Sequence, residues 1–383
     1  MNGTIYMPVG EACSSISDTY REKKNMVTLI NTSDVLEGRV LNHERVPNSN
    51  LKGQFKKTFQ RDDILYSEIR PQNRRFAYVD FSPIDYIAST KLMVIRAKKD
   101  VVSPKYLYYF LKNTSTVAEL QLLAETRSGT FPQITFSEVA NLTIPVPSLA
   151  VQEVIVQTMQ CLEDKITCNE QINDNLQQQA MALYAEMFLN SSDDNVTSGT
   201  LSDIAVITMG QSPSGSSYNE DGVGEVFYQG RAEFGFRFPK PRLFTTEPKR
   251  MAETGDVLLS VRAPVGDLNE AYERCCIGRG LGAIHSKTGH SSFVLYTMFA
   301  LRSQLDVFNG EGTVFGSINR DALNAIPIDI PPVTEIDQFE AVAHPMDELI
   351  RANYEENCRI EAIRDSLLPK LMSGEIDVSA VKL

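Results

Sequence analysis

The chain has 383 residues, of which 42% are hydrophobic and 22% charged, and its formal net charge is −12. This length allows two or three domains with their own cores, and the composition excludes a disordered or fibrous protein. Because the sequence has no run of about 18 apolar residues and does not start like a signal peptide, we expect a cytoplasmic protein without membrane segments.

The cysteines indicate neither a zinc site nor a disulfide framework. They form no CxxC pair and have no histidine at the spacing of metal ligands. We expect reduced thiols that mostly pack in the interior, namely Cys13, Cys161, Cys168, Cys275, Cys276 and Cys358.

Residues 1–147 have the pattern of a mixed α/β globule. Strand-like runs occupy 62–71 and 86–95, and an amphipathic helix that Ser103 would cap occupies 103–113.

A short helix and a strand follow. Thr135 and Glu138 have the spacing of a capping box, and an alternating apolar strand at 142–146 ends close to a proline.

A long helix is predicted from Ser148 to Leu189. Alternate steps of three and four residues from Met159 give a seam that is apolar except at Asn169 and Asn173. A buried Asn in a helical seam lowers stability but fixes register and partner.

The remaining chain repeats this plan after a polar run at 190–199, which we expect to be a hinge. Residues 255–264 resemble the first strand of the earlier copy, 276–284 the second and 291–301 its Ser-capped helix.

The end of the second copy matches the first at an offset of 184 residues. Asn319 would cap the short helix, and 326–330 would form the strand before a second long helix.

This second long helix is predicted from Pro332 to about Leu371, with Asn353 and Asn357 at the seam positions that match the first Asn pair. Pro345 and Pro369 lie within its pattern, so we expect the helix to be interrupted.

The matched Asn pairs favour pairing of the two helices with each other, antiparallel about a pseudo-two-fold axis, although any amphipathic helix has an apolar stripe. The predicted pairing residues are Leu162, Ile166, Asn169, Asn173, Leu176, Ile350, Asn353, Asn357 and Ile360.

The negative charge is concentrated in the two helical segments. Residues 148–196 carry −7 and 332–383 carry −6, whereas 1–147 carry +4 and 197–331 carry −3. An anionic ligand is therefore expected on the globular regions, and the helices are better suited to a protein partner.

Catalytic motifs are missing from the sequence. It has no phosphate loop, no HExxH, no GxSxG and no methyltransferase-type Asn-Pro-Pro-Tyr. The glycine-rich run at 278–282 is interpreted as a tight turn, and the histidines as ordinary surface or core residues.

A carboxylate pair, Glu163-Asp164, recurs as Asp347-Glu348. Adjacent carboxylates point to different faces of a helix, so we interpret both pairs as part of an acidic exterior rather than as a catalytic acid and base.

Several blocks, in order, resemble the specificity (S) subunit of type I restriction-modification systems. They are MGQSPSGSSYNEDGVGEVFYQG (209–230), GDVLLSVRAPVGDLN (255–269) with CIGRGLGAI (276–284), the helical block 144–188, and LLPKLMSGEIDV (367–378). Residues 1–18 match the family pattern weakly.

This resemblance implies two target-recognition domains and two antiparallel spacer helices that set the gap between two DNA half-sites. The implied boundaries are 1–147 and 197–331 for the recognition domains, 148–196 for the first helix with its linker, and 332–383 for the second helix and tail.

The resemblance also implies a non-catalytic chain that binds double-stranded DNA and holds no cofactor itself. Its partners would be two modification subunits that use S-adenosylmethionine to methylate adenine, and restriction subunits that use ATP and Mg²⁺.

Phosphate contacts need Lys, Arg or small hydroxyls, and base contacts need Arg, Lys, Asn or Gln. A solvated surface charge is the alternative for each Lys or Arg, and a structural ion pair for Arg70 and Arg262, which end the repeated strand. The DNA-contact candidates are Lys56, Lys57, Arg70, Arg74, Arg75, Arg127, Gln133, Gln211, Ser214, Tyr218, Gln229, Arg231, Arg262 and Arg279.

Two other classes remain open from the residues alone. One is a coiled-coil scaffold that does not touch nucleic acid, which the acidic balance favours slightly and which the near-neutral globules with arginine-bearing repeated strands disfavour. The other is a self-sufficient nuclease or methyltransferase, which the missing motifs disfavour.

Overall fold

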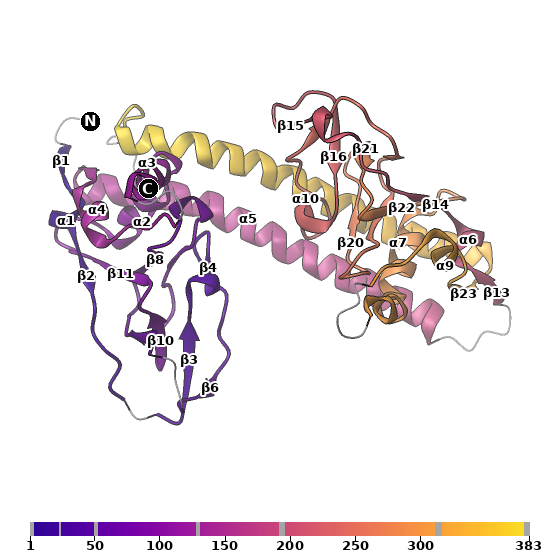
Figure 1. Cartoon of the computed structure of the whole chain (residues 1–383), viewed down its shortest axis with the longest axis horizontal. Helices are drawn as coiled ribbons and strands as arrows, with labels where there is room; N and C mark the ends of the chain where they lie inside the picture. The colour runs from indigo at the N-terminus through magenta and orange to yellow at the C-terminus, as the bar shows by residue number, and fades with distance from the viewer. Residues whose placement is uncertain are drawn as a thin grey trace. The chain divides into compact units, whose positions relative to one another are not determined.

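The computed structural model describes residues 4–22, 24–49, 53–127, 131–190, 196–310 and 316–378. The chain divides into two compact units (Figure 1). The first unit comprises Met1–Cys168 and Glu356–Leu383, and the second unit comprises Asn169–Glu355. Each long helix therefore contributes one segment to each unit.

The first unit contains small strands and helices before the first long helix. Its strands are β1 (Ile5–Pro8), β2 (Cys13–Ile16), β3 (Met26–Ile30), β4 (Val35–Leu36), β5 (Arg39–Val40), β6 (Val46–Pro47), β7 (Phe55–Lys57), β8 (Ile64–Ser67), β9 (Phe76–Tyr78), β10 (Tyr86–Ser89), β11 (Leu92–Ala97) and β12 (Thr143–Val146). Its short helices are α1 (Val9–Ala12), α2 (Pro104–Lys112), α3 (Thr114–Arg127) and α4 (Phe136–Asn141).

The second unit has a similar set. Its strands are β13 (Thr197–Thr200), β14 (Ala205–Met209), β15 (Tyr218–Asn219), β16 (Glu225–Tyr228), β17 (Phe244–Thr245), β18 (Met251–Ala252), β19 (Val257–Ser260), β20 (Leu268–Glu270), β21 (Cys275–Ile277), β22 (Leu281–Ser286) and β23 (Pro327–Ile330). Its short helices are α6 (Leu201–Ile204), α7 (Ser291–Ala300), α8 (Arg302–Asp306) and α9 (Arg320–Asn324).

The sheets of the two units follow the same order, except that β15 is an additional strand in the second unit, and this agreement confirms the predicted duplication. The first unit has β2-β11-β8-β9 and β6-β3-β10-β7, and the second has β14-β22-β19-β20 and β15-β17-β16-β21-β18. In each unit one pair is parallel, β3 with β10 and β16 with β21, and the neighbouring pairs are antiparallel. Apolar side chains from the two sheets of each unit pack together as a small core.

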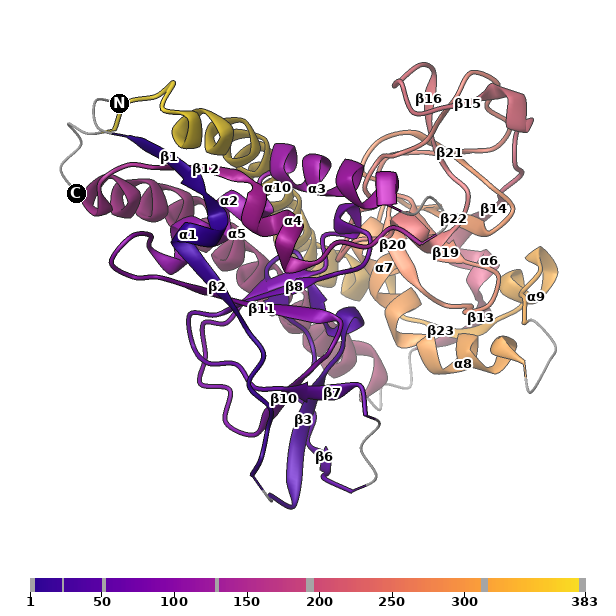
Figure 2. The same ribbon diagram turned by 60° about the vertical axis from the view of Figure 1, so that its left-hand side comes forward.

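The N-terminal residues belong to the repeat despite their weak sequence match. β1 pairs with β12 beside α1 (Figure 2), as β13 pairs with β23 beside α6. Val9 and Ala12 are buried on α1, and Leu201 and Ile204 are buried on α6. The two copies share this burial pattern although their residues differ.

The short helices before β12 and β23 were predicted correctly. Thr135 and Glu138 form the capping box of α4, and the Asn319 side chain accepts a hydrogen bond from the Ala322 backbone N–H at the start of α9.

The helix over 291–301 differs from its prediction. α7 has His290 at its N-cap, and the Glu340 carboxylate of the second long helix accepts hydrogen bonds from the Ser292 and Phe293 N–H groups. All residues from Ser292 to Met298 are buried, so α7 is a core helix and not an amphipathic one.

The first long helix, α5 (Leu149–Tyr184), continues as a π-helical turn over Ala185–Leu189, close to the predicted range. The predicted hinge at 190–199 is partly wrong, because Thr197–Thr200 form β13. Residues 191–195 lie outside the described residues.

The second long helix, α10 (Val333–Ser373), is continuous, and the predicted interruption is wrong. Pro345 is exposed, so the backbone carbonyl that loses its partner there can bind water. Buried Phe339, Ala343 and Leu371 hold the helix against its surroundings on either side of the prolines. Packing thus offsets the lost backbone hydrogen bonds.

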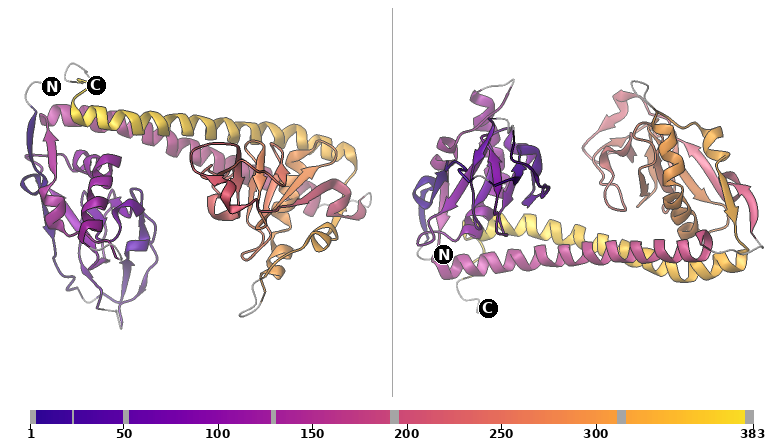
Figure 3. Two further views of the ribbon diagram at one scale, coloured as in Figure 1. Left: turned by 45° about the horizontal axis from the view of Figure 1, so that its top comes forward. Right: turned by 90° about the horizontal axis from the view of Figure 1, so that it is seen from below.

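α5 and α10 lie side by side in each unit and run antiparallel, as predicted (Figure 3). In the first unit, Lys165 lies 2.9 Å from Glu356. In the second unit, the rings of Tyr184 and Phe339 are in contact, with centroids 5.6 Å apart. All the predicted pairing residues on both helices are buried or half-buried.

Buried amides join the helices in the second unit. Asn353 Nδ2 donates to Asn173 Oδ1 at 2.8 Å, and Asn173 Nδ2 donates to the Ile350 carbonyl at 3.4 Å. Ile350 is fully buried beside them. Asn169 is fully buried as well.

Among the described residues, no helix is both long and apolar enough to cross a membrane. All six cysteines are free thiols, but Cys161, Cys168 and Cys358 are exposed on the long helices. The prediction that the cysteines mostly pack inside therefore holds for only half of them.

We predict that Asn353→Ala destabilises the protein by about 1–3 kcal/mol, because it leaves the buried Asn173 Oδ1 without its hydrogen-bond donor. Asp174→Ala, an exposed change on α5 next to Asn173, should have little effect. Urea unfolding followed by circular dichroism measures both. Equal stability of the two variants would contradict a structural role for the amide pair.

Candidate nucleic-acid interface

Four chain segments of the second unit converge at the side of its sheets where several strands end and loops begin. β14, β16, β19 and β21 all end there, because β16 runs parallel to β21 and the other two pair antiparallel to β22, which begins at this edge. The Gln211 N–H donates to the Ile277 carbonyl, and the Val261 N–H donates to the Gly280 carbonyl. We call this region the loop edge of the second unit.

Glycines allow the backbones to approach closely at the loop edge. A Cβ on Gly210 would lie 2.1 Å from the Gly278 carbonyl oxygen, and a Cβ on Gly280 would lie 2.7 Å from the Gln229 carbonyl oxygen. The run at 278–282 is therefore the tight turn that the sequence indicated. It brings Arg279 beside the chain at Gln229.

Four of the sequence candidates are exposed at this edge. Gln211, Gln229 and Arg262 follow the ends of β14, β16 and β19, and Arg279 lies in the turn between β21 and β22. Within the described part of the chain, none of these four side chains makes a hydrogen bond or an ion pair. They are available for an external ligand.

The other candidates of the second unit have partners in the fold. The Tyr218 hydroxyl donates to the Pro213 carbonyl at 3.0 Å, and Arg231 forms an ion pair with Asp267. The Ser214 hydroxyl is hydrogen-bonded to Ser216. These residues shape the loops around the edge.

Several candidates of the first unit also bind their own backbone. Lys57 Nζ donates to the Thr90 and Leu92 carbonyls, and Arg75 Nη1 donates to the Ser33 carbonyl. Burial lowers the pKa of Lys57. Lys57 and Arg75 are therefore structural residues in this conformation.

Three further candidates of the first unit are paired with side chains. Arg74 lies 3.4 Å from Glu37, and Arg127 forms a 2.8 Å ion pair with Glu138. The Gln133 carbonyl oxygen accepts a hydrogen bond from Lys91 Nζ.

Lys56 and Arg70 are the exposed candidates without a side-chain partner among the described residues of the first unit. Arg70 and Arg262 do not occupy equivalent positions. The β-bridge of Arg262 with Ser317 matches that of Ile69 with Gln133, so Arg262 corresponds to Ile69. The repeat therefore places the two arginines one residue apart.

The repeated carboxylate pair has a role that the sequence interpretation missed. In the first unit, Glu163 accepts hydrogen bonds from the Tyr109 hydroxyl and from Lys112 Nζ. In the second unit, Asp347 accepts one from the Tyr296 hydroxyl at 2.8 Å. The first carboxylate of each pair thus anchors a short helix of the globule to a long helix.

Asp347 belongs to a buried charge network, which contradicts its assignment to the acidic exterior. Arg237 Nη1 lies 3.0 Å from Asp347 Oδ1 and 3.6 Å from Glu270, and its Nη2 donates to Tyr296. The Arg237 side chain is only 2% exposed. The neighbouring Glu348 is exposed, as expected for the opposite helix face. The sequence contained a signal for this contact, because each short helix has a tyrosine, Tyr109 in α2 and Tyr296 in α7, that donates to the first carboxylate of the pair.

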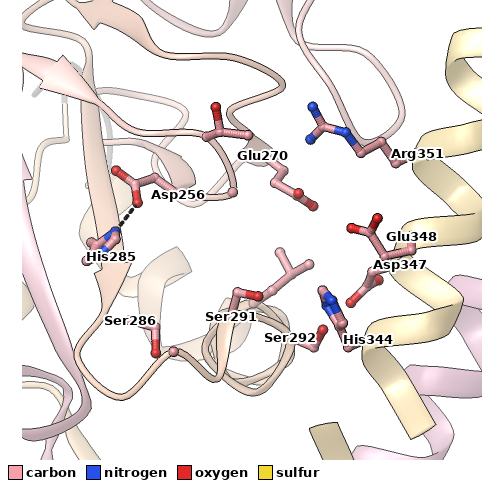
Figure 4. A pocket seen from close by; sticks show the side chains of 14 residues that line it. Asp256, Glu270, His285, Ser286, Ser291, Ser292, His344, Asp347, Glu348 and Arg351 are labelled. Atoms are coloured by element: carbon pink, nitrogen blue, oxygen red, sulfur yellow. Dashed lines mark hydrogen bonds and ion pairs between the residues drawn. The ribbon is translucent and has the colours of Figure 1, made fainter. Parts of the chain in front are cut away.

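A cavity of about 300 Å³ opens beside this network in the second unit (Figure 4). His344, Asp347 and Glu348 extend toward it from α10, and Glu270 faces them from β20. Burial raises the pKa of Glu270 to about 7, against the opposing effect of Arg237. The described residues contain no group of His, Cys, Asp or Glu side chains that could hold a metal ion.

We predict that Glu270 makes the free energy of unfolding depend on pH. Its folded-state pKa of about 7 exceeds the ordinary 4.5, so its contribution is present below pH 4.5 and is lost as the pH rises through 7. The loss is at most about 3 kcal/mol.

Glu270→Gln should remove this slope, whereas Glu348→Gln at the exposed neighbour should keep it. Unfolding free energies between pH 5 and pH 8.5 measure the difference. A wild-type slope that survives in Glu270→Gln would show that other groups cause it.

Comparisons with known proteins agree with the duplicated fold. Residues 13–178 match the family model described as type I restriction modification DNA specificity domain. A protein of Methanocaldococcus jannaschii, described as the specificity subunit of the type I restriction enzyme MjaX, is 30% identical over 337 residues, which cover 82% of this chain and 79% of that protein.

Two other comparisons are partial or distant. The HindI specificity subunit of Haemophilus influenzae is 41% identical over 177 residues, covering 46% of this chain and 39% of that protein. The crystal structure of a type I restriction-modification S subunit from M. genitalium covers 97% of both chains with a TM-score of 0.52 and 16% identity, which supports the fold alone.

Proposed function

Because the chain belongs to the family of type I restriction enzyme specificity subunits, we propose that it selects the DNA sequence on which a restriction-modification complex acts. Each globular domain reads one half of a split target. The chain itself performs no chemistry and holds no cofactor.

The observation that carries this proposal is the duplicated sheet arrangement. A chain that builds one domain plan twice presents two related surfaces, and different loop residues on those surfaces recognise different sequences. The first unit has Lys56 and Arg70 exposed for this purpose, and the second has its loop edge.

The paired helices set the distance between the two half-sites. α5 is one continuous helix of 36 residues, which corresponds to about 54 Å at 1.5 Å per residue. A rigid element of this kind, with its register fixed by buried amides, holds a constant spacing better than a flexible linker.

The acidic outer faces of the helices bind partner proteins. We assign them to two modification subunits, which use S-adenosylmethionine to methylate adenine. Restriction subunits that use ATP and Mg²⁺ complete the assembly. The net charges of −7 and −6 on the two helical segments favour basic protein surfaces over DNA.

Titration of the purified complex against its own target duplex and against random duplexes tests this function. We expect tighter binding to the target by about 10³-fold or more at physiological salt. A complex that binds no duplex would instead fit a scaffold role for the chain.

We predict that the target gap follows helix length. Insertion of seven residues after Cys168 in α5 and seven before Glu356 in α10, at the boundary between the two units, preserves the seam period and lengthens the helix pair by about 10 Å. Mapping of methylated adenines should then show a gap about three base pairs longer, at 3.4 Å per base pair.

The control is a seven-residue insertion in the loop at 220–224, outside the helices, which should leave the gap unchanged. An unchanged gap in the helix variant would remove the measuring role from α5 and α10.

A further inference from the structure

We propose that Gln211, Gln229, Arg262 and Arg279 form the base-reading set of the second unit and recognise adenine and guanine in the major groove of DNA. This inference rests on the proposed function and adds to it the residues and the base chemistry of one half-site.

Topology brings these four positions together from distant parts of the sequence. The backbone bonds between Gln211 and Ile277, and between Gly280 and both Gln229 and Val261, hold the four segments at one edge. The Arg279 N–H donates to the Ser212 hydroxyl, which fixes the turn beside the first loop. A set of side chains on such tied segments is preorganised for binding.

The four side chains make no hydrogen bond or ion pair within the described residues, a property that they share with the exposed Arg250 and Arg320 of the same unit. Arg274 and Arg242 are also exposed, but each forms two ion pairs with carboxylates of the fold. Arg262 and Arg279 form none among the described residues. An exposed guanidinium without a carboxylate keeps its full positive potential for an anionic ligand.

The residue types indicate which bases are read. An arginine makes two hydrogen bonds to the O6 and N7 atoms of guanine, and a glutamine makes two to the N6 and N7 atoms of adenine. Two arginines and two glutamines therefore predict a half-site that offers guanine and adenine to this edge. Glutamine side chains can also bind phosphates, so the effect of each variant on sequence preference distinguishes base readout from phosphate contact.

The equivalent edge of the first unit has different chemistry. There Lys91 binds Glu68 and Gln133, so the turn between β10 and β11 carries side chains that already have partners. Arg70, next to it, is exposed and has no side-chain partner among the described residues. The two domains therefore read their half-sites with different side chains.

The test uses the full chain in complex with its partner subunits, and the target found by methylation mapping. Duplex pools keep the first half-site fixed and randomise one position at a time in the second. Arg279→Ala should relax the preference for guanine at one position by about 10- to 100-fold, and should leave the first half-site unchanged.

Gln229→Glu gives a sharper result. A glutamate accepts a hydrogen bond from the N4 amino group of cytosine, so we expect the preference at one position to move from adenine toward cytosine. Because Gln229 is exposed, this change should not affect folding, which thermal unfolding checks.

The matched control is Arg274→Ala, which removes the same charge at the opposite end of β21. The inference is wrong if Arg279→Ala weakens binding to all sequences equally, as a phosphate contact would, or if its sequence preference equals that of the control. A wild-type complex without any sequence preference would instead overturn the proposed function itself.

Discussion

The pairing of α5 with α10 is the constraint on which the rest of the structure depends. Each unit takes one segment of each helix, and the first unit is built from two separate pieces of chain, Met1–Cys168 and Glu356–Leu383. Both helices therefore contribute buried side chains to the core of each unit as well as to their contact with each other. A buried amide contact between Asn173 and Asn353 requires one register, because any slip would leave polar groups buried without partners.

The globules are attached to these helices by polar as well as apolar contacts. Apolar residues of α5 and α10, such as Met159 and Leu371 in the first unit, are part of the domain core. The tyrosine contacts to Glu163 and Asp347 add direction to this packing, because a hydrogen bond fixes the orientation of the groups it joins. Each domain is thereby held in a defined orientation on its own helical segment, as a reading surface requires.

The sequence was informative wherever the two copies retain the same residues or the same spacing. The Asn pairs, the apolar seam and the capping residues Thr135 and Asn319 predicted the helices correctly, because these signals act locally. The continuity of α10 could not be predicted in the same way. It depends on tertiary packing around Pro345, which overrides the local preference against proline.

The candidate site was predicted only as a set of residue types. Sequence alone could not separate Lys57, which binds two backbone carbonyls, from the adjacent Lys56, which is exposed. It also could not show that Gln211 and Arg279 lie on neighbouring segments, because strand pairing between distant residues decides that. In the structure, exposure and hydrogen-bond partners distinguish such residues. The candidates of the second unit that have no partner among the described residues all lie at the loop edge.

The most direct measurement of the account is the methylation pattern of the native genome with this gene present and with it deleted. Deletion should remove adenine methylation from one split motif, with two short specified halves and unspecified bases between them. Loss of a continuous motif, or no change in methylation, would contradict the division of recognition between two domains.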